Sequence, residues 1–359
     1  MSLSIVIAGG GTGGHLYPGL AVARALQARV SDVTVTFVGT AAGIEARVIP
    51  RESLPLVFIR SAGLKGKSIG ALLRGLALLP LSAWDSWRAI SRLKPNVVLG
   101  VGGYSSGPVV LLAALRGIPT LLIEQNATAG LTNRLLARVV TAAAVTYPES
   151  LATFGSRAFV SGNPVRQEFF QASTVESATN RPPNVLVFGG SQGAHALNLS
   201  MIDAAPHLAS QPTRMAVTHQ TGERDLEVVR DGYRRANLPA RVEPFLFEMD
   251  REMAAADIVV SRSGATTLAE ISASGRAAIL VPLPTATDDH QRRNAEVMVA
   301  RNAAVMIEQR HLTGESLARE ILALAGDRDR RERLGAAARA LARPDAARVI
   351  VDKVLALAG

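Results

Sequence analysis

The residues best suited to chemistry lie in Asp257–Gly275, which reads DIVVSRSGATTLAEISASG. The apolar run Ile258–Val260 predicts a strand buried on both faces, and small polar residues separate it from a predicted helix over Ala265–Ala273. Unpaired N–H groups and the positive dipole at the start of such a helix favour a phosphate. Glu270 lies about one turn beyond Thr266 on the same helix face and can accept both hydroxyls of a ribose. These features predict a nucleotide site, with a capped helix that carries a surface Glu as the alternative.

A second candidate is His15, which ends the glycine-rich sequence GGGTGGH after the apolar run Leu3–Ala8. This sequence lacks the usual setting of the dinucleotide motif GxGxxG, because no acidic residue ends the second predicted strand, where Gly39 and Thr40 stand. NAD binding is therefore not expected, and the glycines instead let a substrate approach the backbone. A histidine on such a loop is placed for proton transfer, with a packed or surface histidine as the alternative.

Two further loops hold polar side chains. EQNATAGLTN follows a predicted strand and offers Glu124 and Asn126 as ligands, although Asn and Gly are also ordinary turn residues. GGSQGA opens the second half of the chain, where Ser191 and its neighbouring N–H groups can hold a phosphate, with a structural turn as the alternative.

The sequence TDDHQRRNAE begins another predicted helix. Asp288 and Asp289 are typical of a helix N-terminal cap. His290, Gln291 and Asn294 offer donors and acceptors that suit sugar hydroxyls. Asp288 and His290 lack a third metal ligand, and no DxD motif occurs, so we expect no metal-diphosphate site.

Short apolar runs alternate with helical patterns along most of the chain, which indicates an α/β fold with parallel sheets covered on both faces. The pattern pauses near residue 160 at SGNPVR, then restarts as at the N-terminus with an apolar strand, a glycine-rich turn and a helix. We predict two Rossmann-like domains, residues 1–163 and 164–342, whose glycine-rich loops face a cleft, and an amphipathic helix at 343–359. The first helix is expected from about Pro18 to Arg29. The expected strands are Leu3–Ala8, Val33–Val38, Val57–Ile59, Val97–Gly100, Leu121–Ile123, Val139–Val145, Val185–Phe188, Met215–Thr218, Val242–Phe245, Ile258–Val260, Ala278–Val281 and Val305–Ile307.

The composition bounds the class of protein. With 359 residues, 48% of them hydrophobic and none cysteine, the chain is globular, long enough for two domains, and without thiol catalysis or zinc–thiolate sites. No basic region precedes Leu3, so no signal peptide is expected, and no apolar run reaches the ~18 residues of a membrane span. Residues 1–163 contain 15 Lys and Arg against 6 Asp and Glu, so the net charge of +9 lies in the first half and favours an anionic partner there.

The segment Leu64–Trp87 is densely apolar, with Lys65, Lys67 and Arg74 among its residues, and Pro80 is expected to break it. One interpretation is a pair of core helices joined at Pro80. The other is a surface that enters a bilayer interface, with its apolar side chains down and its cations toward anionic lipid.

Together, GGGTGGHLYPGLAVA, EQNATAGLTN, SGNPVR, GGSQGA, SRSGATTLAE and DDHQRRNA, in this order over nearly the whole chain, closely resemble the MurG family of bacterial glycosyltransferases. The resemblance implies a GT-B fold and an inverting transfer of N-acetylglucosamine (GlcNAc) in peptidoglycan synthesis. The donor would be UDP-GlcNAc, and the acceptor the C4 hydroxyl of MurNAc-pentapeptide on undecaprenyl diphosphate (lipid I to lipid II). It also implies a peripheral protein on the cytoplasmic face of the inner membrane, an anionic membrane surface as partner, no nucleic acid, no cofactor and no metal.

By motif position, the resemblance places the donor in the C-terminal domain and the lipid acceptor in the N-terminal domain, onto which the last helix would pack. Leu246 would contact uracil through its backbone and Glu270 the ribose, while His290 and Gln291 would bind the sugar. Ser191 and Arg166 would lie near the diphosphate. The substrate-binding residues implied are Thr12, Gly13, Gly14, Asn126, Arg166, Ser191, Leu246, Ala265, Thr266, Thr267, Leu268, Ala269, Glu270, His290 and Gln291.

For catalysis, the resemblance implies a single displacement in which the acceptor hydroxyl attacks opposite to departing UDP. The helix that starts at Ala265 and the guanidinium of Arg166 can stabilise the leaving group without a metal. His15 is the first candidate for the base and Glu124 the second. Two positions depart from the family pattern: His290-Gln291 stands where some members carry Gln-Gln, and Ile123 where members often carry His.

Two other classes of protein share parts of this pattern. A UDP-GlcNAc 2-epimerase has the same architecture but no need of the apolar and basic segment Leu64–Trp87. A non-catalytic nucleotide-sugar sensor would keep Glu270 and Ser191 but not need His15.

Overall fold

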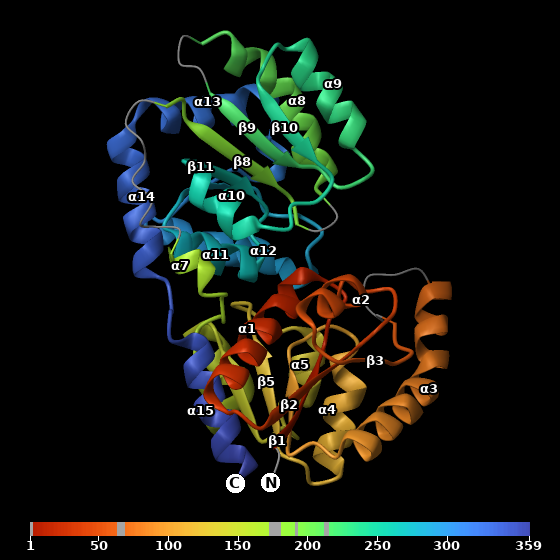
Figure 1. The fold of residues 1–359 in the computed structure, drawn as a ribbon. Helices are drawn as coiled ribbons and strands as arrows, with labels where there is room; N and C mark the ends of the chain where they lie inside the picture. The colour runs from red at the N-terminus through yellow and green to blue at the C-terminus, as the bar shows by residue number, and fades with distance from the viewer. Residues whose placement is uncertain (1–2, 63–68, 172–180, 191–192, 212–214) are drawn as a thin grey trace. The chain divides into compact units, whose positions relative to one another are not determined.

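The computed structural model describes residues 3–62, 69–171, 181–190, 193–211 and 215–359, with the backbone alone at 69–76 and 287. The chain divides into two compact units (Figure 1). Unit 1 consists of Met1–Arg166 together with Arg343–Gly359, and unit 2 of Gln167–Ala342.

Unit 1 is built on a 7-stranded parallel sheet in the order β3-β2-β1-β4-β5-β6-β7. Its inner strands are buried on both faces, as parallel strands between helices must be. The strands are β1 (Leu3–Ala8), β2 (Val33–Gly39), β3 (Leu56–Phe58), β4 (Val97–Gly100), β5 (Thr120–Glu124), β6 (Ala142–Val145) and β7 (Ala158–Val160). The helices are α1 (Gly13–Arg29), α2 (Glu45–Val48), α3 (Ile69–Leu93), α4 (Ser106–Leu115), α5 (Leu131–Leu136), α6 (Leu151–Phe154) and α15 (Ala346–Ala358).

Unit 2 repeats the architecture with a 6-stranded parallel sheet in the order β10-β9-β8-β11-β12-β13. The strands are β8 (Asn184–Phe188), β9 (Ala216–Gln220), β10 (Ala240–Glu243), β11 (Ile258–Ser261), β12 (Ala277–Leu280) and β13 (Val305–Met306). The helices are α7 (Glu168–Gln171), α8 (His195–Ala209), α9 (Leu226–Arg235), α10 (Met249–Ala255), α11 (Ala265–Ser274), α12 (His290–Ala300), α13 (Gly314–Gly326) and α14 (Arg328–Ala340). The predicted α/β fold class is confirmed.

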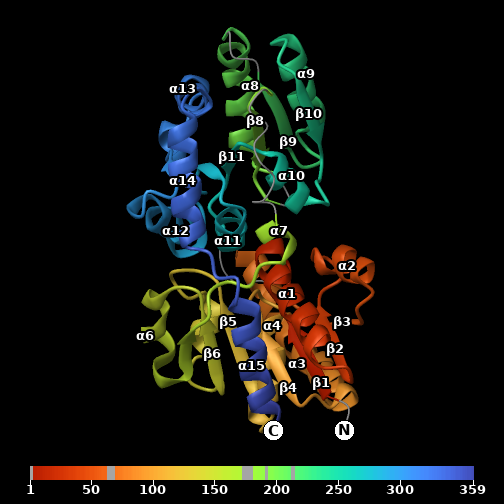
Figure 2. The same cartoon turned by 60° about the vertical axis from the view of Figure 1, so that its left-hand side comes forward.

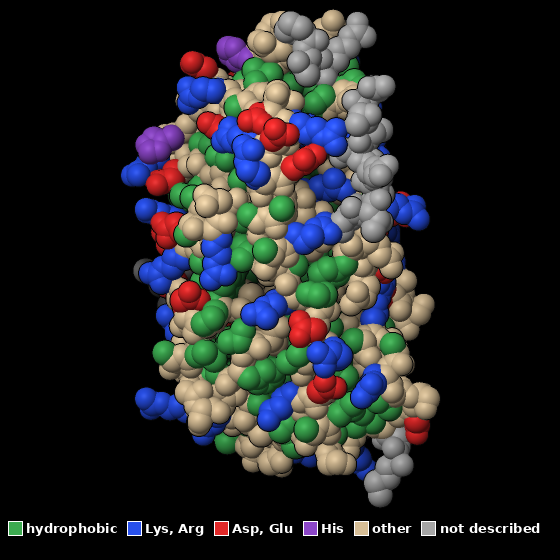
Figure 3. Space-filling view, turned by 90° about the vertical axis from the view of Figure 1, so that its left-hand side faces the viewer, with side chains coloured by type: hydrophobic (Ala, Val, Ile, Leu, Met, Phe, Trp, Pro, Cys, Tyr) green, Lys and Arg blue, Asp and Glu red, His purple; other side chains and the backbone are tan. Residues whose placement is uncertain are grey.

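The end of the chain returns to unit 1, where α15 packs against α1 (Figure 2). Its buried face consists of Ala346, Ala347, Ile350, Val351 and Val354, which recur at helical spacing. On the face of the molecule seen in Figure 3, Lys and Arg side chains are interspersed with Asp and Glu, so this face has no field of a single sign.

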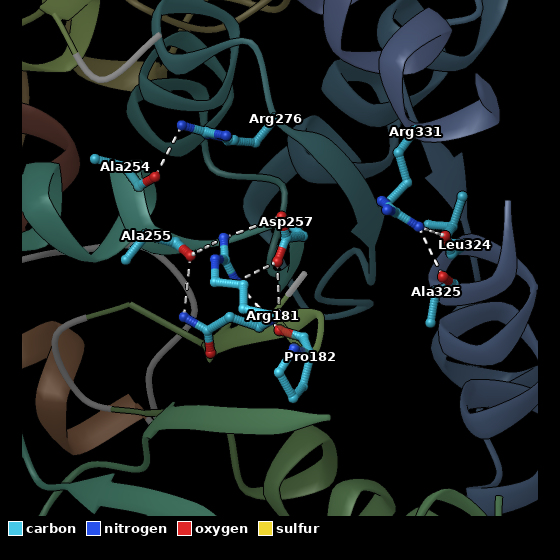
Figure 4. Close-up of polar contacts among 10 residues, drawn as sticks. Arg181, Pro182, Ala254, Ala255, Asp257, Arg276, Leu324, Ala325 and Arg331 are labelled. Carbon is cyan, nitrogen blue, oxygen red and sulfur yellow. Dashed lines mark hydrogen bonds and ion pairs between the residues drawn. The ribbon is translucent and has the colours of Figure 1, made fainter. Parts of the chain in front are cut away.

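At the start of the unit 2 sheet, one carboxylate aligns two strands (Figure 4). Asp257, just before β11, accepts hydrogen bonds from Arg181 Nη1 and from the Asn184 backbone N–H, both at 2.7 Å. Arg181 also donates to the carbonyl oxygen of Ala255 at 3.2 Å. These bonds set the register in which Ile258 lies beside Val185.

The structure corrects several boundaries. α1 begins at Gly13 instead of near Pro18, because a proline so close to the helix start removes only one internal hydrogen bond. Pro80 does not break α3, which runs to Leu93, and Pro80 is exposed, so water can reach the carbonyl that the ring leaves unpaired. β10 ends before Phe245. β7 was not predicted, since its three half-buried residues give too short an apolar pattern.

Candidate functional site

The phosphate-binding site predicted at the start of a helix lies where β11 ends and α11 begins, in unit 2. Ser261 ends the buried strand, Gly264 is the N-cap of α11 and provides no side-chain hydrogen bond, and the helix continues to Ser274. Gly275 ends it in the left-handed conformation, with φ 59°. The first N–H groups of α11 thus point toward the carboxyl edge of the sheet, with the positive end of the helix dipole.

The residues of α11 that are predicted to contact the substrate differ in burial. Thr266 and Glu270 are 6% and 8% exposed, one turn apart. A carboxylate that is almost buried at the edge of a site fits the acceptor of a hydrogen bond better than a surface charge. Ala265 and Leu268 are also buried, and Thr267 and Ala269 are half-buried.

Arg262, which was not predicted from the sequence, precedes α11 and is only 7% exposed. Its Nη1 donates to the carbonyl oxygens of Val281 and Pro282 at 3.0 and 3.2 Å, and its Nη2 to Gln309 Oε1 at 2.7 Å. Burial lowers the pKa of Arg262 to about 10, so it stays cationic at neutral pH. No carboxylate among the described residues forms an ion pair with it, and its hydrogen bonds go to two carbonyl oxygens and one amide oxygen. The sequence feature that could have identified Arg262 is its place in SRSG, as a cation between a buried strand and a glycine.

A second residue that sequence analysis missed is Gln220, at the end of β9 and 2% exposed. Its Nε2 donates to the carbonyl oxygen of Gly190 at 2.8 Å, and its Oε1 accepts from the backbone N–H of Leu246 at 2.8 Å. A single amide therefore joins the glycine-rich loop after β8 to the segment predicted to contact uracil. Because the Leu246 N–H is already engaged, a base held there would use other backbone groups, such as the Leu246 carbonyl. Ser191 lies outside the described residues.

Beneath the same loop lies a chain of buried polar side chains. His219 is fully buried, with Nδ1 2.8 Å from Tyr233 Oη and Nε2 3.1 Å from Asn198 Oδ1. Asn198 Nδ2 donates to Asp225 Oδ2 at 2.8 Å, and Asp225 also lies 3.0 Å from His195 Nδ1 at the start of α8. Burial lowers the pKa of His219 to about 3, so it is neutral at physiological pH. This hydrogen-bonded set of side chains therefore contacts the start of α8 through its one carboxylate, Asp225.

At the start of α12, His290 and Gln291 occupy the first turn and are both half-buried. Gln291 Oε1 accepts from the Leu283 N–H at 3.0 Å, and the Gln291 carbonyl accepts from Ser263 Oγ at 2.8 Å. These bonds bring α12 beside the start of α11. Asp289 is the N-cap of α12, as predicted, but it has φ 52° and makes no side-chain cap bond.

In unit 1, the glycine-rich loop after β1 leads directly into α1. Thr12 is the exposed N-cap, and Gly13, Gly14 and His15 form the first turn instead of a loop. A Cβ at Gly102 would lie 2.6 Å from His15 Nδ1, so the imidazole packs against the backbone of the loop that follows β4.

Glu45, also missed, lies beneath this loop and is fully buried. Its Oε2 accepts from the Gly11 N–H at 2.7 Å, and its Oε1 accepts from the Thr40 N–H at 2.8 Å and from Thr40 Oγ1 at 3.0 Å. No Lys or Arg of the described residues pairs with it. No acidic residue ends β2, but Glu45, five residues beyond Thr40, lies beneath the loop after β1.

Glu124 is a second buried carboxylate in unit 1, at 1% exposed. Its Oε1 accepts from the Asn126 N–H and from Asn126 Nδ2 at 3.0 and 3.2 Å, and its Oε2 accepts from the Gly130 N–H and from Asn133 Nδ2, both at 2.9 Å. Four donors therefore occupy both carboxylate oxygens of Glu124. The arrangement suits a residue that shapes the loop containing Asn126.

The remaining predicted residue, Arg166, ends the first segment of unit 1. Its guanidinium carbon lies 5.3 Å from the centre of the Tyr17 ring on α1, a cation–π distance. No group of His, Cys, Asp or Glu within the described part of the chain could hold a metal ion. Nor does that part contain a helix long and apolar enough to cross a membrane.

Two units that each carry a parallel sheet, with candidate sites at the strand ends, have the architecture of the GT-B fold. The family model for the glycosyltransferase family 28 N-terminal domain matches residues 5–145, and that for the C-terminal domain matches residues 184–350. The chain belongs to glycosyltransferase family 28.

Comparison with individual proteins gives the same result. The chain is 49% identical, over 99% of its length and 93% of the relative's, to the UDP-N-acetylglucosamine--N-acetylmuramyl-(pentapeptide) pyrophosphoryl-undecaprenol N-acetylglucosamine transferase of Anaeromyxobacter sp. (strain K). The crystal structure of Acinetobacter baumannii MurG matches with a TM-score of 0.76 and 32% identity over 99% of both chains. The UDP-GlcNAc 2-epimerase of Neisseria meningitidis matches with a TM-score of 0.69 over 99% of this chain and 100% of the other, but at 14% identity it shows the fold alone.

Proposed function

We propose that this protein transfers GlcNAc from UDP-GlcNAc to the C4 hydroxyl of MurNAc-pentapeptide on undecaprenyl diphosphate. The observation that carries the proposal is the 49% identity over nearly the full length to a transferase with this name. The edge of unit 2, with a helix start, a nearly buried carboxylate and a buried cation, supports a nucleotide-sugar donor.

We assign the donor to unit 2. The start of α11 and Arg262 receive the diphosphate, since both present positive charge at the carboxyl edge of the sheet. Glu270 accepts the ribose hydroxyls, and the Leu246 backbone contacts uracil. His290 and Gln291 bind the sugar. Ala265, Thr266, Thr267, Leu268 and Ala269 line this site, with Ser191 in the loop after β8.

We assign the acceptor to unit 1. Thr12, Gly13, Gly14 and Asn126 stay predicted contacts of the donor, as the family resemblance implies. His15 takes the proton of the attacking C4 hydroxyl, because Glu124 already accepts four hydrogen bonds. The hydroxyl oxygen bonds to the anomeric carbon as the bond to UDP breaks on the opposite face, so the configuration inverts. Arg166 and the α11 dipole stabilise the negative charge on UDP.

We further propose that the protein binds the cytoplasmic face of the inner membrane through α3, α4 and α5, which pack side by side in unit 1. Trp84 and Trp87 are 54% and 46% exposed, and their rings stack with centroids 5.3 Å apart. Arg88 and Arg116 are exposed on the same helices and their ends. Apolar and basic side chains together suit an anionic interface. The other exposed apolar residues of this surface are Leu79, Leu81, Leu111, Leu115, Leu131 and Leu135.

One assay tests the reaction. The protein is incubated with UDP-GlcNAc, with and without the lipid-linked acceptor, and UDP and sugar products are followed. We expect UDP release only with acceptor. Release of an epimer without acceptor would make the protein an epimerase, and neither product would make it a sensor.

A vesicle experiment tests the surface. Binding to anionic vesicles should exceed binding to neutral ones, because each basic residue near the surface contributes up to about 1 kcal/mol, and it should fall at high salt. Trp84→Ser with Trp87→Ser should weaken binding, whereas Val228→Ser, an equally exposed change on α9 of unit 2, should not. Equal binding by both variants would remove α3 from the proposal.

A further inference from the structure

We propose that Glu45 is a positioning residue for the transfer reaction, because its carboxylate holds the loop from which His15 and α1 start. The inference rests on the proposed function, in which His15 is the base. Glu45 does not touch either substrate in this proposal. It acts through the backbone that it binds.

The hydrogen bonds of Glu45 join two loops of unit 1. Three donors from two loops converge on this side chain: the Gly11 N–H on one oxygen, and the Thr40 N–H and hydroxyl on the other. Gly11 belongs to the loop after β1, and Thr40 to the loop after β2. Glu45 therefore fixes the distance between the two loops with both of its oxygens.

The backbone around the Glu45 side chain is closely packed against it. A Cβ at Gly10, Gly39 or Gly43 would collide with atoms of the Glu45 side chain. The glycines around this carboxylate thus leave room for Glu45 as well as for a substrate, and the loops close around it. Burial of polar oxygens without hydrogen-bond partners is costly, so the three hydrogen bonds must be kept for the Glu45 side chain to stay in this place.

Contacts also connect Thr40, and through it Glu45, to the loop that packs against His15. Thr40 Oγ1 lies 3.4 Å from Tyr104 Oη, in the loop after β4. The same loop contains Gly102, whose backbone packs against the His15 ring. Ser61 Oγ donates to the Tyr104 carbonyl at 3.1 Å and joins the segment after β3 to the same loop. A shift at Glu45 therefore reaches His15 from both sides, through Gly11 and through Tyr104.

The decisive variant is Glu45→Gln. A carboxamide has one oxygen, so either Gly11 or Thr40 would face an NH2 group instead of an acceptor. Loss of a hydrogen bond to a charged group corresponds to about a 10- to 150-fold change. We expect kcat to fall by about this factor, with the KM for UDP-GlcNAc within about twofold of the parent, since unit 2 binds the donor.

Folding is followed separately for unit 1, because the two tryptophans of the chain, Trp84 and Trp87, both lie there. Glu52→Gln is the matched control: it removes the same charge from the same segment, but Glu52 pairs with Arg24 at 2.5 Å and not with the loop. Its kcat should stay within about twofold of the parent. A kcat for Glu45→Gln that falls only as the folded fraction falls would overturn the proposal.

If Glu45→Gln does not fold, Thr40→Val and Thr40→Ser replace it. The valine keeps the shape and loses the hydroxyl that binds Glu45, whereas the serine keeps the hydroxyl. We expect kcat about 3- to 10-fold lower for the valine variant, and recovery in the serine variant. Equal kcat in all three proteins would overturn the proposal.

Hydrogen–deuterium exchange separates this inference from the proposed function. In the variant that folds, residues 9–16 should exchange at least about tenfold faster than in the parent, with α11 unchanged. Unchanged exchange at residues 9–16 would overturn the inference even if the enzyme transfers GlcNAc. Failure of the parent to transfer GlcNAc, with faster exchange in the variant, would overturn the assigned reaction and leave the loop contact established.

Discussion

The two units place a glycine-rich loop at the same point of the fold, after β1 and after β8, but hold it with opposite chemistry. In unit 1, the acceptor beneath the loop after β1 is the carboxylate of Glu45, and a second carboxylate, Glu124, binds the loop after β5. In unit 2, the group that binds the loop is the neutral amide of Gln220, and the buried cation Arg262 lies at the next strand end. The loops have similar sequences and different electrostatic surroundings.

The difference indicates which half can receive a phosphate. At about 6 Å in a medium of effective dielectric constant 20, two unit charges interact by about 3 kcal/mol. The buried Glu45 carboxylate, which binds the Gly11 N–H, therefore opposes an anion at the loop of unit 1. In unit 2 the buried carboxylate near the loop, Asp225, lies 3.0 Å from His195 and 3.7 Å from Arg224, and the group that binds the loop is an amide. This agrees with the proposal that UDP binds unit 2 and that a neutral hydroxyl reacts at the edge of unit 1. A glycine-rich sequence alone does not distinguish the two.

The largest effect should come from the base. His15→Ala should lower kcat by about 10²–10⁴-fold, because general-base catalysis contributes that much. UDP affinity should stay unchanged, since His15 lies in the other unit from the donor residues. Steady-state kinetics and UDP calorimetry on the same preparation measure both quantities. An equal fall in UDP affinity would place His15 in the donor site and remove the contrast between the units.

The next variant places a carboxylate beneath the glycine-rich loop of unit 2, as Glu45 lies beneath that of unit 1. Gln220→Glu puts a carboxylate beneath the loop after β8 and sets it against the Gly190 carbonyl. Repulsion of about 2–3 kcal/mol predicts a roughly 30- to 150-fold loss of UDP affinity. Asn237→Asp is the control, the same change at an exposed residue at the start of β10, at the opposite edge of the sheet. Equal UDP affinity in both variants would mean that charge beneath the loop is irrelevant.

Glu270→Ala sharpens the donor assignment in unit 2. Loss of a hydrogen bond to a charged group is worth roughly 1.5–3 kcal/mol, or about 10- to 150-fold in the kcat/KM for UDP-GlcNAc. Thermal unfolding should change little, because alanine favours the helix and α11 keeps its Gly264 N-cap. Donor kcat/KM within twofold of the parent would remove Glu270 from the ribose site.

The smallest expected effect is the change of the free energy of unfolding with pH. The pKa of His219 is lowered to about 3 by burial, against about 6.5 unfolded. Below pH 6.5 the unfolded chain binds a proton that the folded chain does not, so stability falls as pH falls from 6.5 toward 3. Between pH 7 and 5.5 this group should cost about 1 kcal/mol.

Urea unfolding at these two pH values, followed by far-UV circular dichroism, measures the loss. His219→Gln removes the titrating group from unit 2 and should flatten the dependence, although the variant is less stable at pH 7 because it disturbs the bonds to Tyr233 and Asn198. The same slope in the parent and in His219→Gln would assign the acid sensitivity to other groups.

Several features of this protein were determined by the sequence alone. The apolar runs, the glycine-rich turns and their alternation with helices predict the α/β class, because burial on both faces and helical periodicity leave local patterns. The start of α11 after SRSG follows in the same way, and so does the family, since its motifs occur in order along the chain. These are properties of neighbours in the sequence.

Tertiary structure alone decided which groups lie beneath the loops. Glu45 reaches Gly11 across 34 residues, and Gln220 reaches Gly190 across 30 and Leu246 across 26. Such contacts depend on parallel strand order, which brings distant loops to one edge of the sheet. The continuation of α3 through Pro80 likewise depends on the surrounding fold. The four bonds to Glu124, by contrast, come from residues within nine positions of it, and only its burial depends on the rest of unit 1. No local pattern marks a carboxylate as buried and hydrogen-bonded, because burial is a property of the whole fold.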